Sequence, residues 1–189
     1  MNKTTWIVLG SICALILAVG VWAAGAYNGL VARQEGVKSA WGQVENVLQR
    51  RFDLIPNLVN TVKGYAKHEK GVLEEVTRLR SQWGEAKSRT DKMKTAGELD
   101  GVLSRLMVVI ERYPDLKANQ NFMALQDELS GTENRIAVER RSYNETLREY
   151  NVAVRRFPTV LIAGMFGFQK NEEYFEAEKE AKKAVKVEF

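Results

Sequence analysis

A long uncharged stretch near the N-terminus restricts the fold more than any other feature of the chain. No Asp, Glu, Lys or Arg occurs between Lys3 and Arg33. The apolar core of this stretch, Trp6 to Ala26, has 21 residues. As a helix it would be roughly 30 Å long, which matches the hydrocarbon thickness of a bilayer. We therefore predict an N-terminal transmembrane anchor over residues 1–27, followed by a separate folded part.

A cleaved signal peptide is the alternative interpretation of this stretch, because Ala24-Gly25-Ala26 fits an A-x-A cleavage site. The apolar run is longer than that of a usual signal peptide, which favours an uncleaved single-pass anchor. The very short leader with Lys3 is typical of a signal anchor. Such an anchor would place the domain outside the cytoplasm, although the flanking basic residues give no clear orientation.

Small residues recur along the predicted anchor at every fourth position. Gly10, Ala14 and Ala18 form a small-xxx-small face, which allows two transmembrane helices to approach closely. The alternative explanation is that alanine is common in such helices. We predict that this face supports self-association.

After the anchor, the apolar residues follow the period of a packed helix. The first series has steps of three and four residues, as in a coiled coil, and continues through Pro56 without losing register. Its members are Val37, Trp41, Val44, Leu48, Phe52, Ile55, Val59, Val62 and Ala66. A proline inside a helix removes one hydrogen bond and bends the helix. We therefore predict one continuous, kinked helix.

The same pattern predicts an all-α fold for the rest of the chain. Two long helices are expected at about 28–66 and 118–157, and two shorter ones at about 69–87 and 92–113. Their expected inner faces are Val72, Val76, Leu79 and Trp83; Leu99, Leu103, Leu106 and Ile110; and Phe122, Leu125, Leu129, Ile136, Tyr143, Leu147, Tyr150 and Val154. Short connections favour an antiparallel helical bundle over residues 28–157. Because the short pair covers only part of the long pair, a two-helix stalk is expected at the anchor end.

The segment that follows the bundle, residues 157–168, is apolar and uncharged. It is too short to span a bilayer. It could enter the bilayer surface, seal the stalk, pair with a neighbouring subunit or simply cap the bundle. Phe157, Leu161, Phe166 and Phe168 are its candidate interaction residues. Together with a charged helix predicted at Glu172 to Lys186, it makes up a C-terminal part over residues 158–189.

Two clusters of charged residues are the other candidate interaction sites. The first long helix carries Arg50, Arg51 and Asp53, and the second carries Glu133, Arg135, Glu139, Arg140 and Arg141. In an antiparallel pair the clusters can face one another, and Arg–carboxylate pairs would then fix the register. Binding of an acidic ligand or a partner protein is the functional alternative.

The composition gives little support to catalysis. His68 is the only histidine and Cys13 the only cysteine, so the usual di-iron and zinc ligand sets cannot be built from this chain. There is no GxGxxG, P-loop or GxSxG motif. Charges of both signs are mixed, with a net charge of +4, and do not indicate nucleic-acid binding. We expect no catalytic residue, metal or cofactor.

Several long runs resemble the LemA family of bacterial membrane proteins. They are YNGLV (27–31), AWGQVENVLQRRFDLIPNLVNTVKGYAKHE (40–69), ERYPDLKANQNFMALQDELSGTENRIAVERRSYNE (111–145), and the pairs YN and FP within 150–158. The resemblance implies an N-terminal anchor and an antiparallel helical bundle. A relative in that family is associated with magnetosome membranes, which implies membrane organisation. The resemblance carries no settled biochemical function and no catalytic residues.

Two hypotheses for the function follow from these features. The first is a non-enzymatic, membrane-anchored scaffold that forms homo-oligomers. The second is an adaptor that binds another membrane protein, such as a protease or a secretion component, through the same stalk, and it predicts a partner that is lost on charge reversal at Arg50 and Arg51.

Overall fold

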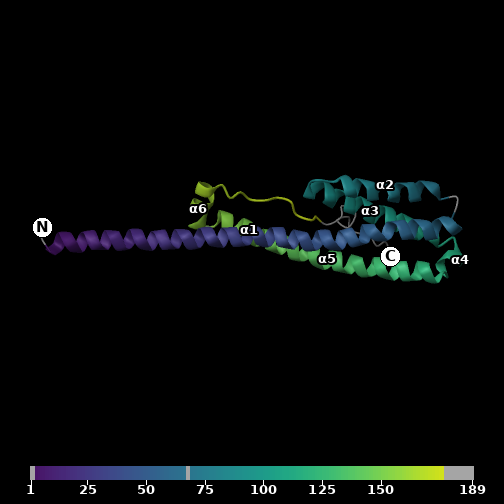
Figure 1. Cartoon of the computed structure of the whole chain (residues 1–189), viewed down its shortest axis with the longest axis horizontal. Helices are drawn as coiled ribbons and strands as arrows, with labels where there is room; N and C mark the ends of the chain where they lie inside the picture. Colours follow the sequence, from purple (N-terminus) through teal and green to yellow (C-terminus); the bar gives the residue numbers. More distant parts are fainter. Residues whose placement is uncertain (1–2, 67–68, 177–189) are drawn as a thin grey trace, which may run out of the picture. The chain divides into compact units, whose positions relative to one another are not determined.

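The structure, a computed structural model, describes residues 3–66 and 69–176 (Figure 1). These residues form helices and connecting segments, with no strand among them, as the sequence predicts. The first helix, α1, runs from Lys3 to Tyr65 without a break and contains Pro56. The prediction of a continuous helix through the proline is therefore confirmed. The predicted boundary between anchor and bundle, at residue 27, falls within this same helix.

Five further helices follow. They are α2 (Lys70–Glu85), α3 (Arg89–Ile110), α4 (Pro114–Lys117), α5 (Gln120–Arg155) and α6 (Thr159–Phe166). The predicted bounds of the two short and two long helices agree with α2, α3, α1 and α5 to within a few residues. The α3 helix begins and ends three residues before the approximate bounds predicted for it. One prediction was wrong: residues 172–176 of the predicted charged helix are not helical. The remainder of that helix lies outside the described residues.

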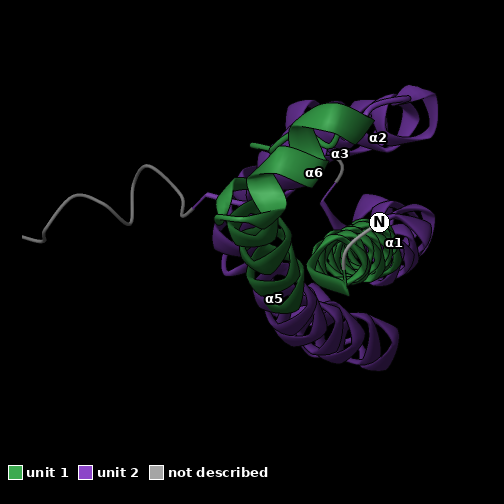
Figure 2. Cartoon of the chain, turned by 90° about the vertical axis from the view of Figure 1, so that its left-hand side faces the viewer, with its two compact units in different colours: residues 1–41, 142–172 green, residues 42–141, 173–189 purple. Residues whose placement is uncertain are grey.

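The chain divides into two compact units, which Figure 2 shows in different colours. Unit 1 comprises residues 1–41 and 142–172, and unit 2 comprises residues 42–141 and 173–189. Each long helix contributes to both units. The candidate interaction residues are thus distributed between the span and α6 in unit 1 and the charged clusters in unit 2.

Unit 2 contains the four-helix part of the fold. The ion pairs Glu75–Arg105 and Glu69–Arg112 join α2 to α3 in antiparallel order. Phe52 on α1 stacks on Trp83 of α2, with ring centroids 4.6 Å apart. The described residues of the predicted inner faces are buried, except that Leu73 replaces Val72 on α2 and Leu125 is only half-buried.

Unit 1 is built on the first part of α1, the last part of α5 and α6. Trp41 on α1 packs edge-on against Tyr143 on α5, at a centroid distance of 5.6 Å. Farther along, Val37 and Leu30 of α1 and Leu147, Tyr150 and Val154 of α5 are buried. Toward the N-terminus, the large apolar side chains of α1 between Trp6 and Trp22 are exposed. The structure therefore has the two-helix arrangement predicted for the anchor end of the bundle.

Candidate functional site

The predicted span is the part of α1 with the most exposed apolar surface. It belongs to the one described helix that is long and apolar enough to cross a membrane. Gly10, Ala14 and Ala18 are exposed and lie along one face of that helix. Added Cβ atoms at Gly10 would meet no other atom within 4 Å. The small-residue face is therefore open to contact from outside the chain.

The apolar segment 157–168 forms α6 and returns to the end of the span. Its Phe166 ring lies 4.8 Å from the ring of Tyr27, and its Phe168 ring lies 5.7 Å from the same tyrosine. Ile162 and Ala163 are buried. The sequence left several positions open for this segment. In the structure it packs onto the two-helix part of the bundle.

Hydrogen bonds hold α6 in this position. The Thr159 hydroxyl donates to the backbone carbonyl oxygen of Ala153 at 2.6 Å. The backbone carbonyl oxygen of Arg156 lies 2.7 Å from the same hydroxyl. After α6, Gly167 has φ of 75°, a left-handed conformation that favours glycine at a helix end. The Asn151 side chain then donates to the Asn171 carbonyl at 2.7 Å and accepts from the Asn171 backbone N–H at 2.9 Å.

Tyr150 provides another anchor for the chain after α6. Its hydroxyl donates to the carbonyl oxygen of Gln169 at 3.0 Å. Burial raises the pKa of this hydroxyl, because the phenolate would lose its hydration. The tyrosine therefore stays a neutral hydrogen-bond donor at physiological pH.

The outer face of α6 and the residue before it remain exposed. Phe157 and Met165 are each 76% exposed, and Leu161 is 57% exposed. We call Phe157, Leu161, Met165 and Phe166 the apolar face of α6. An exposed apolar surface of this kind, beside a span, is typical of contact with lipid or with another protein.

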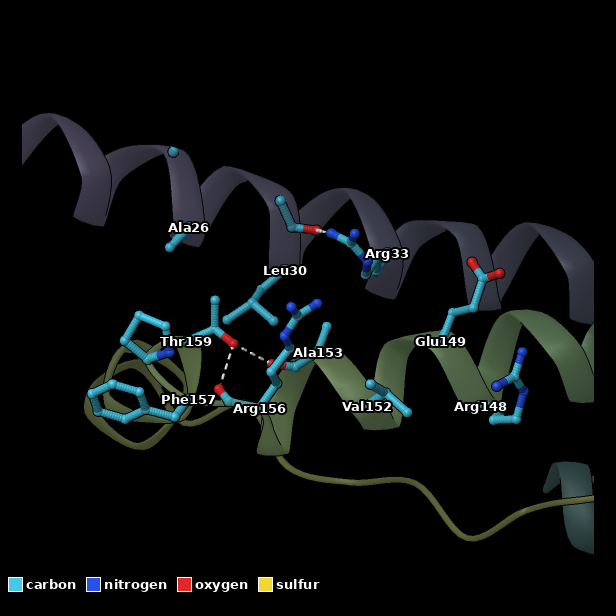
Figure 3. A pocket seen from close by; sticks show the side chains of 13 residues that line it. Ala26, Leu30, Arg33, Arg148, Glu149, Val152, Ala153, Arg156, Phe157 and Thr159 are labelled. Atoms are coloured by element: carbon cyan, nitrogen blue, oxygen red, sulfur yellow. Dashed lines mark hydrogen bonds between the residues drawn. The ribbon is translucent and has the colours of Figure 1, made fainter.

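A pocket of about 630 Å³ lies next to this face, within unit 1 (Figure 3). We call it the arginine pocket. It is lined by Gly25, Ala26, Gly29, Leu30 and Arg33 of α1, by Arg148, Glu149, Val152 and Ala153 of α5, and by Arg156, Phe157, Pro158 and Thr159. Figure 3 shows the side chain of Arg156, just after the end of α5, extending toward α1, and the side chain of Arg33 lying along α1. Sequence analysis did not identify these residues, because they are far apart in the chain.

The charged clusters meet in unit 2. Arg51 is buried, and its guanidinium donates to the carboxylates of Asp100 on α3 and Glu133 on α5, the second at 3.2 Å. Arg140 donates to the other oxygen of Asp100 at 3.3 Å. The predicted contact between the two clusters is thus present for Arg51 and Glu133, but the central partner, Asp100, was missed.

The other members of these clusters lie at the surface or in local contacts. Arg50 pairs with Glu128, and Asp53 accepts a hydrogen bond from Gln49 at 2.9 Å. Arg135 and Arg141 are exposed. Because Asp100 lies between two guanidinium groups from α1 and α5, the cluster fixes the register of three helices. Such a role needs no ligand.

The single cysteine and the single histidine of the chain are Cys13 and His68. Cys13 is exposed on the span, and His68 lies outside the described residues. Within the described part of the chain, no three His, Cys, Asp or Glu side chains are grouped as metal ligands are.

The fold and these sites define a class of all-helical proteins with a single candidate membrane span. The chain belongs to the LemA family, whose family model matches residues 40–189. It is 25% identical to Protein LemA of Metamycoplasma hominis over 152 residues, which cover 78% of this chain and 69% of that protein.

Two magnetosome proteins are also similar to this chain. Magnetosome protein MamQ 2 of Paramagnetospirillum magneticum is 28% identical over 176 residues, and MamQ of Magnetospirillum gryphiswaldense is 27% identical over 175. Each alignment covers 79% of this chain. The chain spans 64% of the length of these two relatives.

Proposed function

We propose that this chain is a membrane-anchored helical scaffold that assembles with copies of itself at the bacterial inner membrane and has no enzymatic activity of its own. The observation that carries the proposal is the exposed face of Gly10, Ala14 and Ala18 on a helix that continues into the folded part. Small residues let two helix backbones approach, and van der Waals packing then holds them together in lipid.

The continuity of α1 gives this pairing a structural consequence. Residues 3–41 of α1 belong to unit 1, as do the parts of α5 and α6 that pack on them. When two spans pair, the unit 1 surfaces that follow them are brought close together. The span therefore serves as an assembly element as well as an anchor.

The relatives support a role at membranes in general terms. Two relatives are named as magnetosome proteins, and their alignments cover 79% of this chain. In this proposal the domain faces the periplasmic or extracellular side, as the short leader with Lys3 favours.

The test is the mass of the complex that the full chain forms in mild detergent, measured for wild type and two double variants. Gly10→Leu with Ala14→Leu blocks close approach on the small-residue face. Val8→Leu with Val19→Leu enlarges side chains elsewhere on the same helix and is the matched control. We expect an oligomer for wild type and control, and a smaller species for the first variant. An unchanged mass for the first variant would contradict assembly through this face.

An adaptor is the second candidate, and a groove in unit 2 favours it. The groove is about 760 Å³ and is lined by the end of α1 and by α2. Its lining includes three basic side chains, Lys63, Lys70 and Arg78, and one acidic side chain, Glu74, which suits an acidic partner segment. Recovery of a stoichiometric second protein from the native membrane would support this candidate.

Charge reversal at Arg51 is not a suitable test of the adaptor. Because this side chain is buried between carboxylates, its reversal would disrupt the fold itself. Lys63→Glu with Arg78→Glu is the appropriate variant, since both side chains are exposed. Loss of the second protein with these changes would assign its contact to the groove.

A further inference from the structure

We propose that the arginine pocket binds the anionic headgroup of a phospholipid from the membrane that holds the span. The inference rests on the proposed anchor, but it does not depend on self-assembly. The proposed ligand is a phosphate ester that carries acyl chains. Guanidinium groups of the pocket would bind the phosphate, and apolar side chains would contact the acyl chains.

The charge of the pocket favours an anion. Arg33, Arg148 and Arg156 contribute three positive charges, and Glu149 is the only acidic residue in the lining. Within the described residues, none of the three arginines forms an ion pair; Arg33 donates only to a backbone carbonyl. Exposed guanidinium groups that are not already paired can donate two parallel hydrogen bonds to a phosphate.

The wall of the pocket leaves room for a headgroup. On α1 three of its five lining residues, Gly25, Ala26 and Gly29, have little or no side chain. The Arg33 guanidinium donates to the carbonyl oxygen of Gly29 at 3.1 Å, so it lies along this wall (Figure 3). A Cβ atom at Gly29 would come within 3.4 Å of that guanidinium. The volume of about 630 Å³ is in the range of small-ligand sites.

The position of the pocket on α1 selects a lipid over a soluble anion. Its lining begins at Gly25 and Ala26, where the predicted span ends, which is the level of the phosphate groups in a bilayer. Phe157 belongs both to the lining and to the apolar face of α6. The ring contacts of Tyr27 keep α6 at the same level. A phosphate held by the arginines would therefore have its acyl chains beside apolar side chains.

The experiment is native mass spectrometry of the full chain in mild detergent, titrated with three probes. Phosphatidylglycerol carries the anionic headgroup and acyl chains, phosphatidylcholine has acyl chains without net charge, and glycerol 3-phosphate has the phosphate without acyl chains. We expect saturable binding of phosphatidylglycerol, with phosphatidylcholine and glycerol 3-phosphate binding at least tenfold more weakly.

Two pairs of variants assign the binding to the pocket. Arg33→Gln with Arg156→Gln removes two of its charges. Arg135→Gln with Arg141→Gln removes two exposed arginines elsewhere on α5, which form no ion pair among the described residues. Each Arg near a membrane surface contributes about fivefold to attraction of anionic lipid, so the pocket variant should bind phosphatidylglycerol roughly 25-fold more weakly. The control should bind it like wild type. Arg33→Lys with Arg156→Lys keeps both charges but cannot donate the paired hydrogen bonds, so its affinity should lie between those of wild type and the pocket variant.

Three results would overturn the proposal. They are equal binding of phosphatidylcholine, equal losses in the pocket and control variants, and binding of glycerol 3-phosphate as tight as that of the lipid, which would mean a soluble-anion site. The same spectra report the oligomer mass. A monomer that still binds phosphatidylglycerol through the pocket would reject self-assembly and leave the lipid site standing.

Discussion

At the scale of single residues, Asp100 is the group on which the packing of unit 2 depends most. Its carboxylate receives hydrogen bonds from Arg51 and from Arg140, one on each oxygen. Arg51 is only 4% exposed. Without Asp100, the buried Arg51 guanidinium would keep only Glu133, whose side chain is 64% exposed, as a charged partner.

Asp100→Asn should therefore lower the free energy of unfolding substantially. Breaking one partner of a buried ion pair typically costs about 3–5 kcal/mol. The measurement is urea unfolding of the full chain, followed by circular dichroism at the helix band. Arg50→Ala is the control: Arg50 and Glu128 form a more exposed pair, so its loss should cost at most about 1 kcal/mol. Equal effects of the two variants would show that Asp100 has no special role.

The sequence predicted only part of this cluster, for a physical reason. Arg51 and Glu133 lie on helices that an antiparallel path brings together, so their contact follows from the order of the helices. Asp100 lies on α3, whose rotation about its own axis depends on packing against α1, α2 and α5 together. Periodicity identifies the buried face of α3, but it does not show which flanking polar residue will meet a neighbour.

At the scale of helices, the spacing of apolar residues was sufficient to predict α1, α2, α3 and α5, because each has one strongly apolar face. It failed where a helix is short or uniformly apolar. The α6 segment has no polar residue between Val160 and Phe166, so no period distinguishes a helix from an extended run. Its position instead depends on tertiary contacts with Tyr27 and on the hydrogen bonds of Thr159.

The start of α3 was also predicted three residues too late, because Ser88 was assigned to a connection. The Ser88 hydroxyl oxygen in fact accepts a hydrogen bond from the Asp91 backbone N–H at 3.0 Å, as the N-cap of α3. A serine three residues before an acidic residue is a typical helix start, and this signal was available in the sequence.

Ser88→Ala should remove this cap and destabilise unit 2 by about 1 kcal/mol. Thermal unfolding, followed by circular dichroism, would measure the effect. Ser81→Ala provides the comparison, because Ser81 lies on the exposed surface inside α2 and bonds only to the carbonyl four residues before it. If the thermal unfolding midpoint of Ser88→Ala equals the midpoints of Ser81→Ala and wild type, the cap contributes nothing to stability.

At the scale of the whole molecule, composition and helix period were enough to predict a helical chain with an N-terminal candidate span, and the described residues agree with that prediction. The arginine pocket could not be predicted in this way. Its residues come from two segments more than 100 positions apart, 25–33 and 148–159. They meet only because α5 returns antiparallel to α1 within unit 1, and each segment by itself looks like an ordinary solvated helix face.

The central claim is that copies of this chain assemble through the face of Gly10, Ala14 and Ala18. Disulfide cross-linking in native membranes tests it most directly, because a disulfide forms only where two Cα atoms approach to within about 7 Å. With Cys13→Ser as the background, a single cysteine is placed in turn at each position from 8 to 20, and the yield of linked dimer after oxidation is measured. The proposal predicts maxima at positions 10, 14 and 18 and minima at 12 and 16. Yields that are low at every position, or that show no helical period, would contradict assembly through this face.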